Sequence, residues 1–193
     1  MSSYGTAFVL DIPASVDPLQ VVRTLNSAPA AFFLTSAFDG KHRIAGLIDA
    51  IEQVEPIAAA LFLAGSGRAA IAEDNDEYGA LWVVLRLAGG PVEIVHRRYV
   101  LNADLTDDQE IADALMDLGG VDPRWADVAG PRAAAAAAAV FGVPAEPMVV
   151  AEAESVTAFE GIGVAGGSFP WWDALQLPWP DSSMGTELSP GLQ

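Results

Sequence analysis

Short apolar stretches separated by turn residues follow one another along the middle of this chain, a pattern typical of β-strands joined by turns. Four apolar stretches share the pattern, with a glycine-rich turn inside each pair: 59–64, 68–72, 80–87 and 92–101. The turn residues between the stretches, together with the high β-branched and aromatic content of the latter pair, favour strands over helices. The sequence therefore predicts an antiparallel meander over about 57–101, in which the acidic residues 73–77 form a solvated connecting loop.

Helical signals flank this meander. A helix is expected where a capping residue or a proline precedes an apolar stripe. Three segments meet this condition: 18–26 after Asp17, the segment after Thr106, and 131–141, which opens at Pro131. The last of them contains seven consecutive alanines, which have the highest helix propensity.

Other segments are less distinct. Residues 8–12 and 31–37 are expected to be strands, and 148–159 fits either a strand or a short helix. In 41–54 the apolar residues fall on one helical stripe, although the Asp39-Gly40 pair before them is a strong hairpin signal. Because the stripe is longer than a typical strand, we expect a helix there.

The length and hydrophobic content of the chain favour one folded domain. With 193 residues, 52% of them hydrophobic, the chain can build a sizeable core. We expect a single α+β domain over 1–181, with a predominantly antiparallel sheet and flanking helices. Residues 182–193 are expected to form a polar, frayed tail.

The charge of the chain is strongly negative and unevenly placed. The formal net charge is −17; residues 1–102 hold 11 acids and 7 bases, whereas 103–193 hold 15 acids and 2 bases. Nucleic acids and anionic membranes are excluded as partners, because their phosphates require clustered Lys and Arg. Two interpretations remain open: the charge steers the chain towards a basic protein surface, or it serves solubility alone.

The absence of cysteine, the N-terminal residues and the lengths of the apolar runs narrow the class of protein further. The chain has no cysteine, which excludes disulfides, cysteine zinc sites and a thiol nucleophile. The N-terminal residues lack the basic and apolar regions of a secretory signal, and each apolar run is shorter than the roughly 20 residues of a membrane span. We expect a cytoplasmic protein.

No complete catalytic motif is present. His42 and His96, the two histidines, are more than fifty residues apart, and no Gly-x-Ser-x-Gly elbow accompanies them. Both are expected at the surface or in a hairpin, with no catalytic role and no metal or cofactor. Arg86, Arg97 and Arg98 lie near His96; alternation places His96 and Arg98 on one strand face and Arg97 on the other, and pairing with nearby acids is expected.

Two further motifs resemble ligand sites but lack required residues. Gly65-Ser66-Gly67 has neither the Lys-Ser/Thr of a phosphate loop nor the third glycine of a dinucleotide fingerprint, so it is expected to be a hairpin turn. The acidic stretch 73–77 partly fits a calcium loop, but Leu85 stands where the bidentate glutamate belongs.

The main candidate for a binding surface is an aromatic segment near the C-terminus, rich in glycine and proline. Tryptophan is enriched in binding hot spots, and glycine and proline can present it in a shaped loop. The expected partner-contacting residues are Gly166, Gly167, Ser168, Phe169, Trp171, Trp172, Asp173 and Trp179. The alternative is that the segment folds back and buries its tryptophans over a sheet face. The two interpretations can coexist.

The overall character of the chain resembles the actinobacterial toxin-immunity proteins, which include the mycobacterial immunity factor for a NAD-hydrolysing necrotizing toxin. The resemblance rests on the acidic, cysteine-free composition, the use of one Lys against eight Arg, and the glycine-plus-tryptophan segment. It implies a protein that binds its cognate toxin and occludes the substrate cleft. No site residue is carried over by motif.

Three classes of function therefore stay open. The first is an inhibitory binding protein, monomeric or weakly dimeric, whose partner has a basic surface. The second is a small hydrolase or ligand-binding domain, and the third is a structural subunit of a homo-oligomer.

Overall fold

A seven-stranded antiparallel sheet forms the centre of the protein, in the order β6-β5-β4-β1-β3-β2-β7. The computed structural model describes residues 4–25, 31–75, 79–101, 107–117, 128–154, 168–180 and 186–188. The strands are β1 (Tyr4–Pro13), β2 (Ala31–Phe38), β3 (Lys41–Ile48), β4 (Gly67–Asn75), β5 (Gly79–Leu87), β6 (Glu93–Leu101) and β7 (Thr186–Glu187). The helices are α1 (Pro18–Leu25), α2 (Val54–Leu63), α3 (Asp108–Asp117), α4 (Pro131–Phe141), α5 (Ala145–Glu154) and α6 (Phe169–Ala174). The α+β class with a predominantly antiparallel sheet is confirmed.

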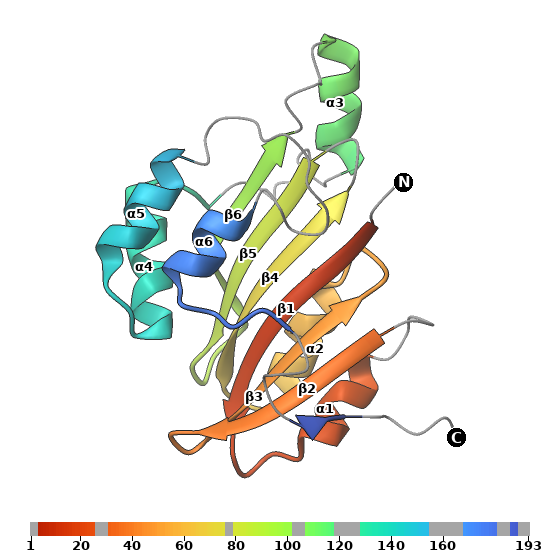
Figure 1. Ribbon diagram of the computed structural model, residues 1–193, viewed down its shortest axis with the longest axis vertical. Coiled ribbons are helices and arrows are strands. Elements are labelled where there is room, and N and C mark those ends of the chain that lie inside the picture. Colours follow the sequence, from red (N-terminus) through yellow and green to blue (C-terminus); the bar gives the residue numbers. More distant parts are fainter. Residues whose placement is uncertain are drawn as a thin grey trace.

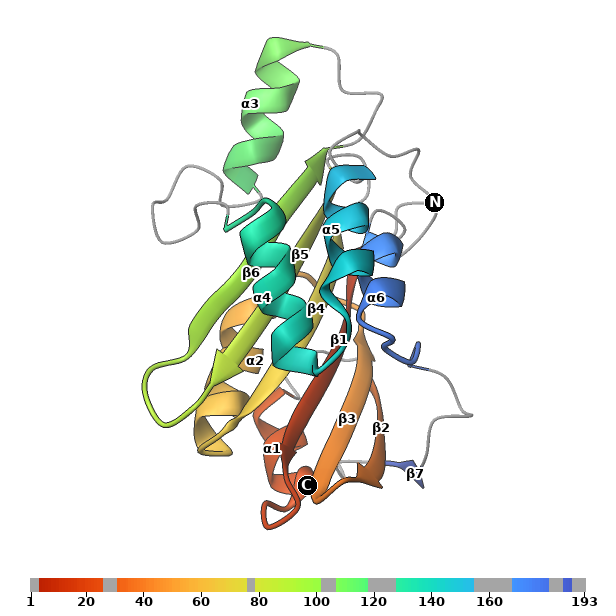
Figure 2. The same cartoon turned by 90° about the vertical axis from the view of Figure 1, so that its left-hand side faces the viewer.

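Helices cover both faces of the sheet (Figures 1 and 2). On one, which we call the front face, α4, α5 and α6 bury a cluster that includes Val9, Trp82, Ala137 and Trp172. On the back face, α1 and α2 bury a second cluster around Phe8. Because both faces are covered, the central strands carry apolar residues on both sides. α3 projects beyond one end of the sheet (Figure 1).

The segment 41–54 is not the helix that its stripe suggested. Residues 41–48 form β3, which pairs with β2 on one side and β1 on the other. Asp39 and Gly40 form the turn, with φ of 47° and 71°, as a two-residue hairpin requires. A strand buried on both faces has nearly continuous apolar residues, and such spacing also fits a helical stripe. The prediction of a helix was wrong for this reason.

The strand expected at 59–64 is also wrong, because these residues belong to α2 and the turn after it. Val54, Ile57, Ala60, Leu61 and Ala64 are buried at helical spacing. Gly65-Ser66-Gly67 therefore joins a helix to a strand and is not a hairpin turn. The meander itself consists of β4, β5 and β6, and its β5 and β6 agree closely with the stretches predicted at 80–87 and 92–101.

Local signals located the other elements. α1 begins after Asp17, whose Oδ1 accepts a hydrogen bond from the Leu19 amide at 3.0 Å. α4 begins at Pro131 and ends at Gly142, whose φ of 71° gives a left-handed C-cap. Asp107 Oδ1 accepts a hydrogen bond from the Gln109 amide at 2.8 Å at the start of α3. The predicted cap Thr106 lies outside the described residues. Within the predicted tail, β7 pairs with β2. No described helix is long and apolar enough to cross a membrane.

Candidate functional site

The two adjacent tryptophans of the aromatic segment are core residues. They lie in α6, where Trp171 is 0% and Trp172 is 2% exposed. Trp82 of β5 stacks on Trp171 with ring centroids 5.9 Å apart, and it meets the edge of Trp172 at 6.0 Å. The sequence left open whether these side chains are presented or buried. The structure buries them over the front face of the sheet.

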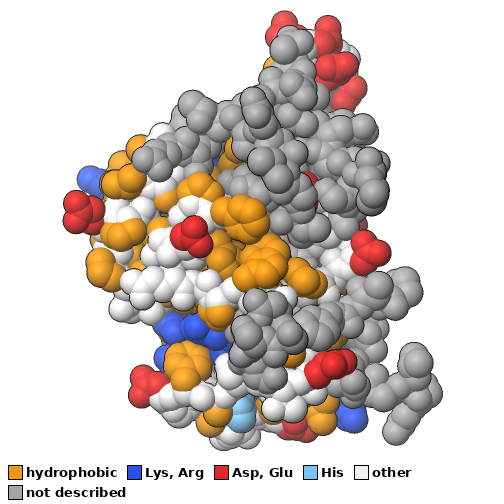
Figure 3. Space-filling model, viewed as in Figure 1, with side chains coloured by type: hydrophobic (Ala, Val, Ile, Leu, Met, Phe, Trp, Pro, Cys, Tyr) orange, Lys and Arg blue, Asp and Glu red, His pale blue; other side chains and the backbone are white. Residues whose placement is uncertain are grey.

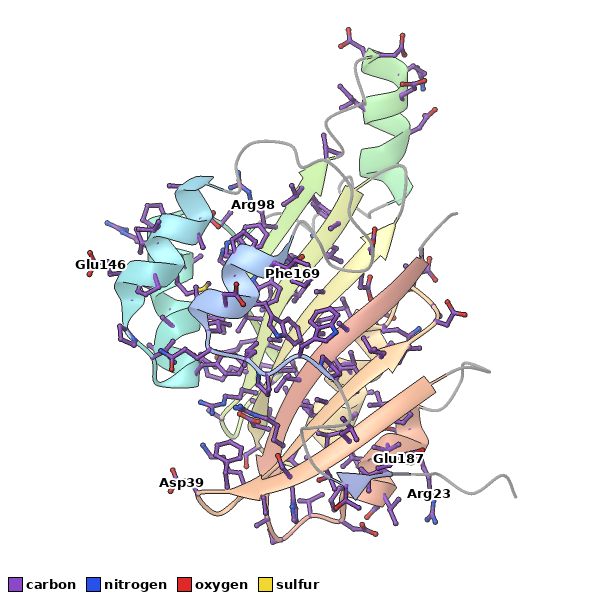
Figure 4. All side chains as sticks on the ribbon, viewed as in Figure 1. Arg23, Asp39, Arg98, Glu146, Phe169 and Glu187 are labelled. Carbon is purple, nitrogen blue, oxygen red and sulfur yellow. The ribbon has the colours of Figure 1, made fainter. Side chains whose placement is uncertain are left out.

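The rest of the segment forms a surface feature that we call the aromatic patch, defined by Phe169 and Trp179. Phe169 is 40% exposed at the start of α6 (Figure 4), and it packs edge-on against the half-buried Trp179 at 5.3 Å. Trp179 in turn packs against Trp172 at 5.5 Å. Asp173 is exposed on the same helix, and Ser168 is buried at its N-cap. Gly166 and Gly167 lie outside the described residues.

A buried carboxylate, Glu152 of α5, ties α6 to the sheet. Its Oε2 lies 2.9 Å from His96 Nε2 and accepts a hydrogen bond from Trp171 Nε1 at 3.2 Å. Its Oε1 accepts from the Gly130 amide at 2.6 Å and from Arg98 at 3.2 Å. Burial opposes ionisation, but the hydrogen bonds from His96 and Gly130 and the charge of Arg98 outweigh it and lower the pKa of Glu152.

The cluster around Glu152 bears on two expectations. His96 was expected at the surface or in a hairpin; it lies on β6 of the β5–β6 hairpin and is fully buried, with the Trp171 ring 5.7 Å away. His96 and Arg98 do share a strand face, because both reach Glu152 across the front face (Figure 4 labels Arg98). The described part of the chain contains no group of three or more His, Asp or Glu arranged to hold a metal. Through Glu152, this cluster joins β6, α5, α6 and the residue before α4.

A row of charged side chains crosses the open end of the front face. In the strand register, Arg86 of β5 lies beside Arg68 of β4, then Asp11 of β1, then Arg43 of β3. Asp11, only 1% exposed, accepts two hydrogen bonds from Arg43, at 2.6 and 2.8 Å, and one from Arg68 Nε at 2.7 Å. Arg68 also donates to the Val140 carbonyl at 2.5 Å, at the end of α4. We call this set the arginine row.

A pocket of about 370 Å³ opens beside the arginine row. Its charged lining consists of Lys41, Arg68, Arg86, Asp11 and Asp39. The Ser66-Gly67 turn and Val140 supply part of the remaining wall. Figure 3 shows Lys and Arg side chains gathered on this part of the front face, below the hydrophobic side chains over α6.

The acidic stretch 73–77 was expected to be a solvated loop, and for its described members this was wrong. Glu73 and Asp74 are buried in β4, while residues 76–78 lie outside the described residues. Glu73 Oε1 accepts a hydrogen bond at 2.6 Å from the backbone amide of Gln53, the residue immediately before α2. Burial raises the pKa of Glu73 to about 7, although its backbone hydrogen bonds lower it.

Sequence reasoning missed the arginine row and Glu152. The signal for the row was Asp11 within the apolar stretch 8–12, because a carboxylate in a core strand requires a cationic partner. Glu152 gave no comparable signal, since it is one of 26 acidic residues and lies in a segment that fitted either a strand or a helix. The predicted pairing of arginines with acids is confirmed for Arg86 with Glu93 and for Arg98 with Glu152.

Comparisons with protein-family models, with curated proteins and with solved structures gave no match to this chain. Two features of the described surface bear on its function, the aromatic patch and the arginine row.

Proposed function

We propose that this chain is an inhibitory binding protein, an immunity factor that neutralises a toxin enzyme by covering its active site with the aromatic patch. The observation that carries the proposal is Phe169, which remains 40% exposed although its neighbours Trp171 and Trp172 are buried. A large apolar side chain held at the surface by a packed support is typical of a binding anchor.

The patch is supported by a series of aromatic contacts. Phe169 packs on Trp179, Trp179 on Trp172, and Trp172 on Trp82 of the central sheet. Contacts of this kind favour binding, because a side chain that is already held in place loses less entropy in a complex. The glycine-rich residues before Ser168 belong to the same proposed contact.

The charge of the chain supports a partner with a basic surface. At −17, the protein attracts a surface rich in Lys and Arg. Exposed acids lie beside the patch at Asp173 and on α3 at Asp108, Glu110 and Asp113. In the view of Figure 3, acidic side chains stand around the hydrophobic group over α6 and at the end formed by α3. A basic enzyme whose substrate cleft admits an aromatic anchor fits this surface.

The test begins with a tagged chain purified from its host, so that a co-purifying enzyme can be identified and assayed. Phe169→Ala should raise the dissociation constant by about thirtyfold and weaken inhibition in parallel, because loss of a central aromatic anchor costs about 2 kcal/mol. Phe62→Ala is the matched control, since Phe62 is 67% exposed on α2 over the opposite sheet face. It should bind and inhibit as the unaltered chain does.

Two results would count against the proposal. One is a complex in which Phe169→Ala and Phe62→Ala have equal affinities. The other is a partner that remains fully active when it is saturated with the unaltered chain.

A further inference from the structure

The pocket beside the arginine row is lined by more cationic than acidic side chains, although the chain as a whole is strongly acidic. Over the whole chain, 26 acidic residues face 9 Lys and Arg. The lining of the pocket holds three cationic side chains, Lys41, Arg68 and Arg86, and two carboxylates, Asp11 and Asp39. Outside the lining, Arg43 pairs with Asp11 and Glu93 pairs with Arg86. Cations therefore outnumber carboxylates here, within a strongly acidic molecule.

We propose that this pocket binds a small molecule through an oxyanion, a carboxylate or a phosphate, held by Arg68, Arg86 and Lys41. Guanidinium groups bind both oxyanions through paired N–H donors, and lysine adds a point charge. A space of about 370 Å³ accommodates a metabolite-sized ligand. The site is separate from the aromatic patch, and the inference does not rest on the proposed inhibitory function.

Arg68 is held in position before any ligand arrives. Its Nε donates to Asp11, and its Nη1 donates to the Val140 carbonyl. Its guanidinium lies 4.6 Å from the centre of the Phe141 ring. The second terminal nitrogen, Nη2, has no hydrogen bond to a described residue. Arg43 neutralises much of the Asp11 charge through two hydrogen bonds, so this carboxylate repels an incoming anion less.

Lys41 and Arg86 can both engage a ligand, for different reasons. Lys41 makes no ion pair with any described residue and is half-buried at the β2–β3 hairpin, whose turn residue Asp39 is labelled in Figure 4. Arg86 pairs with Glu93, but both side chains are about half exposed, at 48% and 52%. An exposed pair contributes little to stability, so a ligand anion can take the place of Glu93 at small cost.

Gly67 allows the backbones of β4 and β1 to approach closely beside the pocket. A Cβ on Gly67 would lie 2.2 Å from the Asp11 carbonyl, and its φ of 142° is one that other residues rarely adopt. Glycine therefore allows β4 to reach β1 where Arg68 meets Asp11. Ser66 and Gly67 line the pocket beside the cations. The NMR signals of their backbone amides should therefore respond to an anion bound there.

The experiment is a calorimetric titration of the full chain with inorganic phosphate and, separately, with citrate, at ionic strength matched with sodium chloride. Saturable binding with a dissociation constant of about 1 mM or tighter is expected for at least one probe. Phosphate alone would identify a phosphate ligand, and citrate alone a carboxylate. Amide shifts of Ser66 and Gly67 in NMR spectra should follow the same binding curve.

Variants that each remove one positive charge distinguish binding at this site from nonspecific attraction of anions to the protein. Lys41→Gln and Arg86→Gln should each weaken binding by about tenfold, the loss expected for one charge-assisted contact. Arg132→Gln is the control, because Arg132 is exposed on α4 and does not line the pocket. The inference is overturned if neither probe saturates, or if Arg132→Gln weakens binding as much as the two pocket variants.

Discussion

Trp171 stacks on Trp82 with the two ring planes inclined at only 13°. The same indole donates its Nε1 hydrogen to Glu152 of α5. One side chain thus joins the central sheet, α5 and α6 through an apolar face and a polar edge, as buried tryptophans commonly do. Trp171 therefore belongs to the core, whereas Phe169, at the start of the same helix, is 40% exposed.

Replacement of either buried tryptophan should destabilise the fold. Trp171→Ala and Trp172→Ala each leave a large cavity over the sheet, and a cost of about 3–5 kcal/mol in the free energy of unfolding is expected. Phe169→Ala, at the exposed end of the same helix, should cost less than about 1 kcal/mol. Urea unfolding followed by circular dichroism compares the three variants. Equal losses for Trp172→Ala and Phe169→Ala would contradict this assignment of core and surface.

Glu152 should make acid stability depend on its ionisation. Because its folded pKa is lowered from 4.5, its contribution is fully present above pH 4.5 and is lost as pH falls through the folded value. Glu152→Gln removes a buried partner of Arg98 and His96, so a loss of roughly 3 kcal/mol is expected at pH 7. The difference from the unaltered chain should shrink below pH 4.5. Unfolding curves that keep a constant separation from pH 7 to pH 3 would speak against this role.

Glu73 should have the opposite pH dependence. Its folded pKa is raised from 4.5 to about 7, so the stability associated with its proton is complete below pH 4.5 and is lost as pH rises through 7. Glu73→Gln keeps an oxygen for the Gln53 amide without the buried charge. This variant should match the unaltered chain below pH 4.5 and be more stable above pH 7, by roughly 3 kcal/mol. Parallel stability curves for the two proteins between pH 4 and 8 would refute the prediction.

Gly46 should tolerate no side chain. A Cβ at this position of β3 would lie 2.6 Å from the Phe8 ring and 2.8 Å from the Phe33 ring, which pack together with centroids 6.0 Å apart. Gly46→Ala should therefore lower the free energy of unfolding by about 1–3 kcal/mol. Gly90→Ala is the control, because a Cβ there meets no atom within 4 Å. Thermal unfolding of both variants gives the comparison, and a similar melting temperature for both would disprove the packing argument.

The elements that could be predicted are those whose signals are local. Asp17 caps α1 through its own side chain, and Pro131 and Gly142 bound α4, so a few adjacent residues determine where each helix begins or ends. The turn at 89–91 separates β5 from β6 in the same way. The segment 41–54 was predicted wrongly, because its local pattern fits two structures. A strand covered on both faces and a helix buried on one side can have similar spacings of apolar residues.

The candidate sites depended on contacts between distant parts of the chain. The arginine row joins Asp11 to residues 32 and 57 positions away, and Glu152 meets His96 across 56 positions. Of the predicted binding segment, Phe169 and Trp179 remain available at the surface, whereas Trp171 and Trp172 do not. Nothing in the local pattern distinguishes adjacent tryptophans from the phenylalanine two residues before them.

The sequence by itself determined the α+β class, the β4–β6 meander, the caps of α1 and α4 and the acidic balance, because propensity, capping and net charge are properties of neighbouring residues or of composition. The tertiary structure alone decided which helices cover each face of the sheet, and therefore which polar groups are buried. Burial of a charge requires a partner from another element, and only the fold brings Asp11 to its arginines and Glu152 to Trp171.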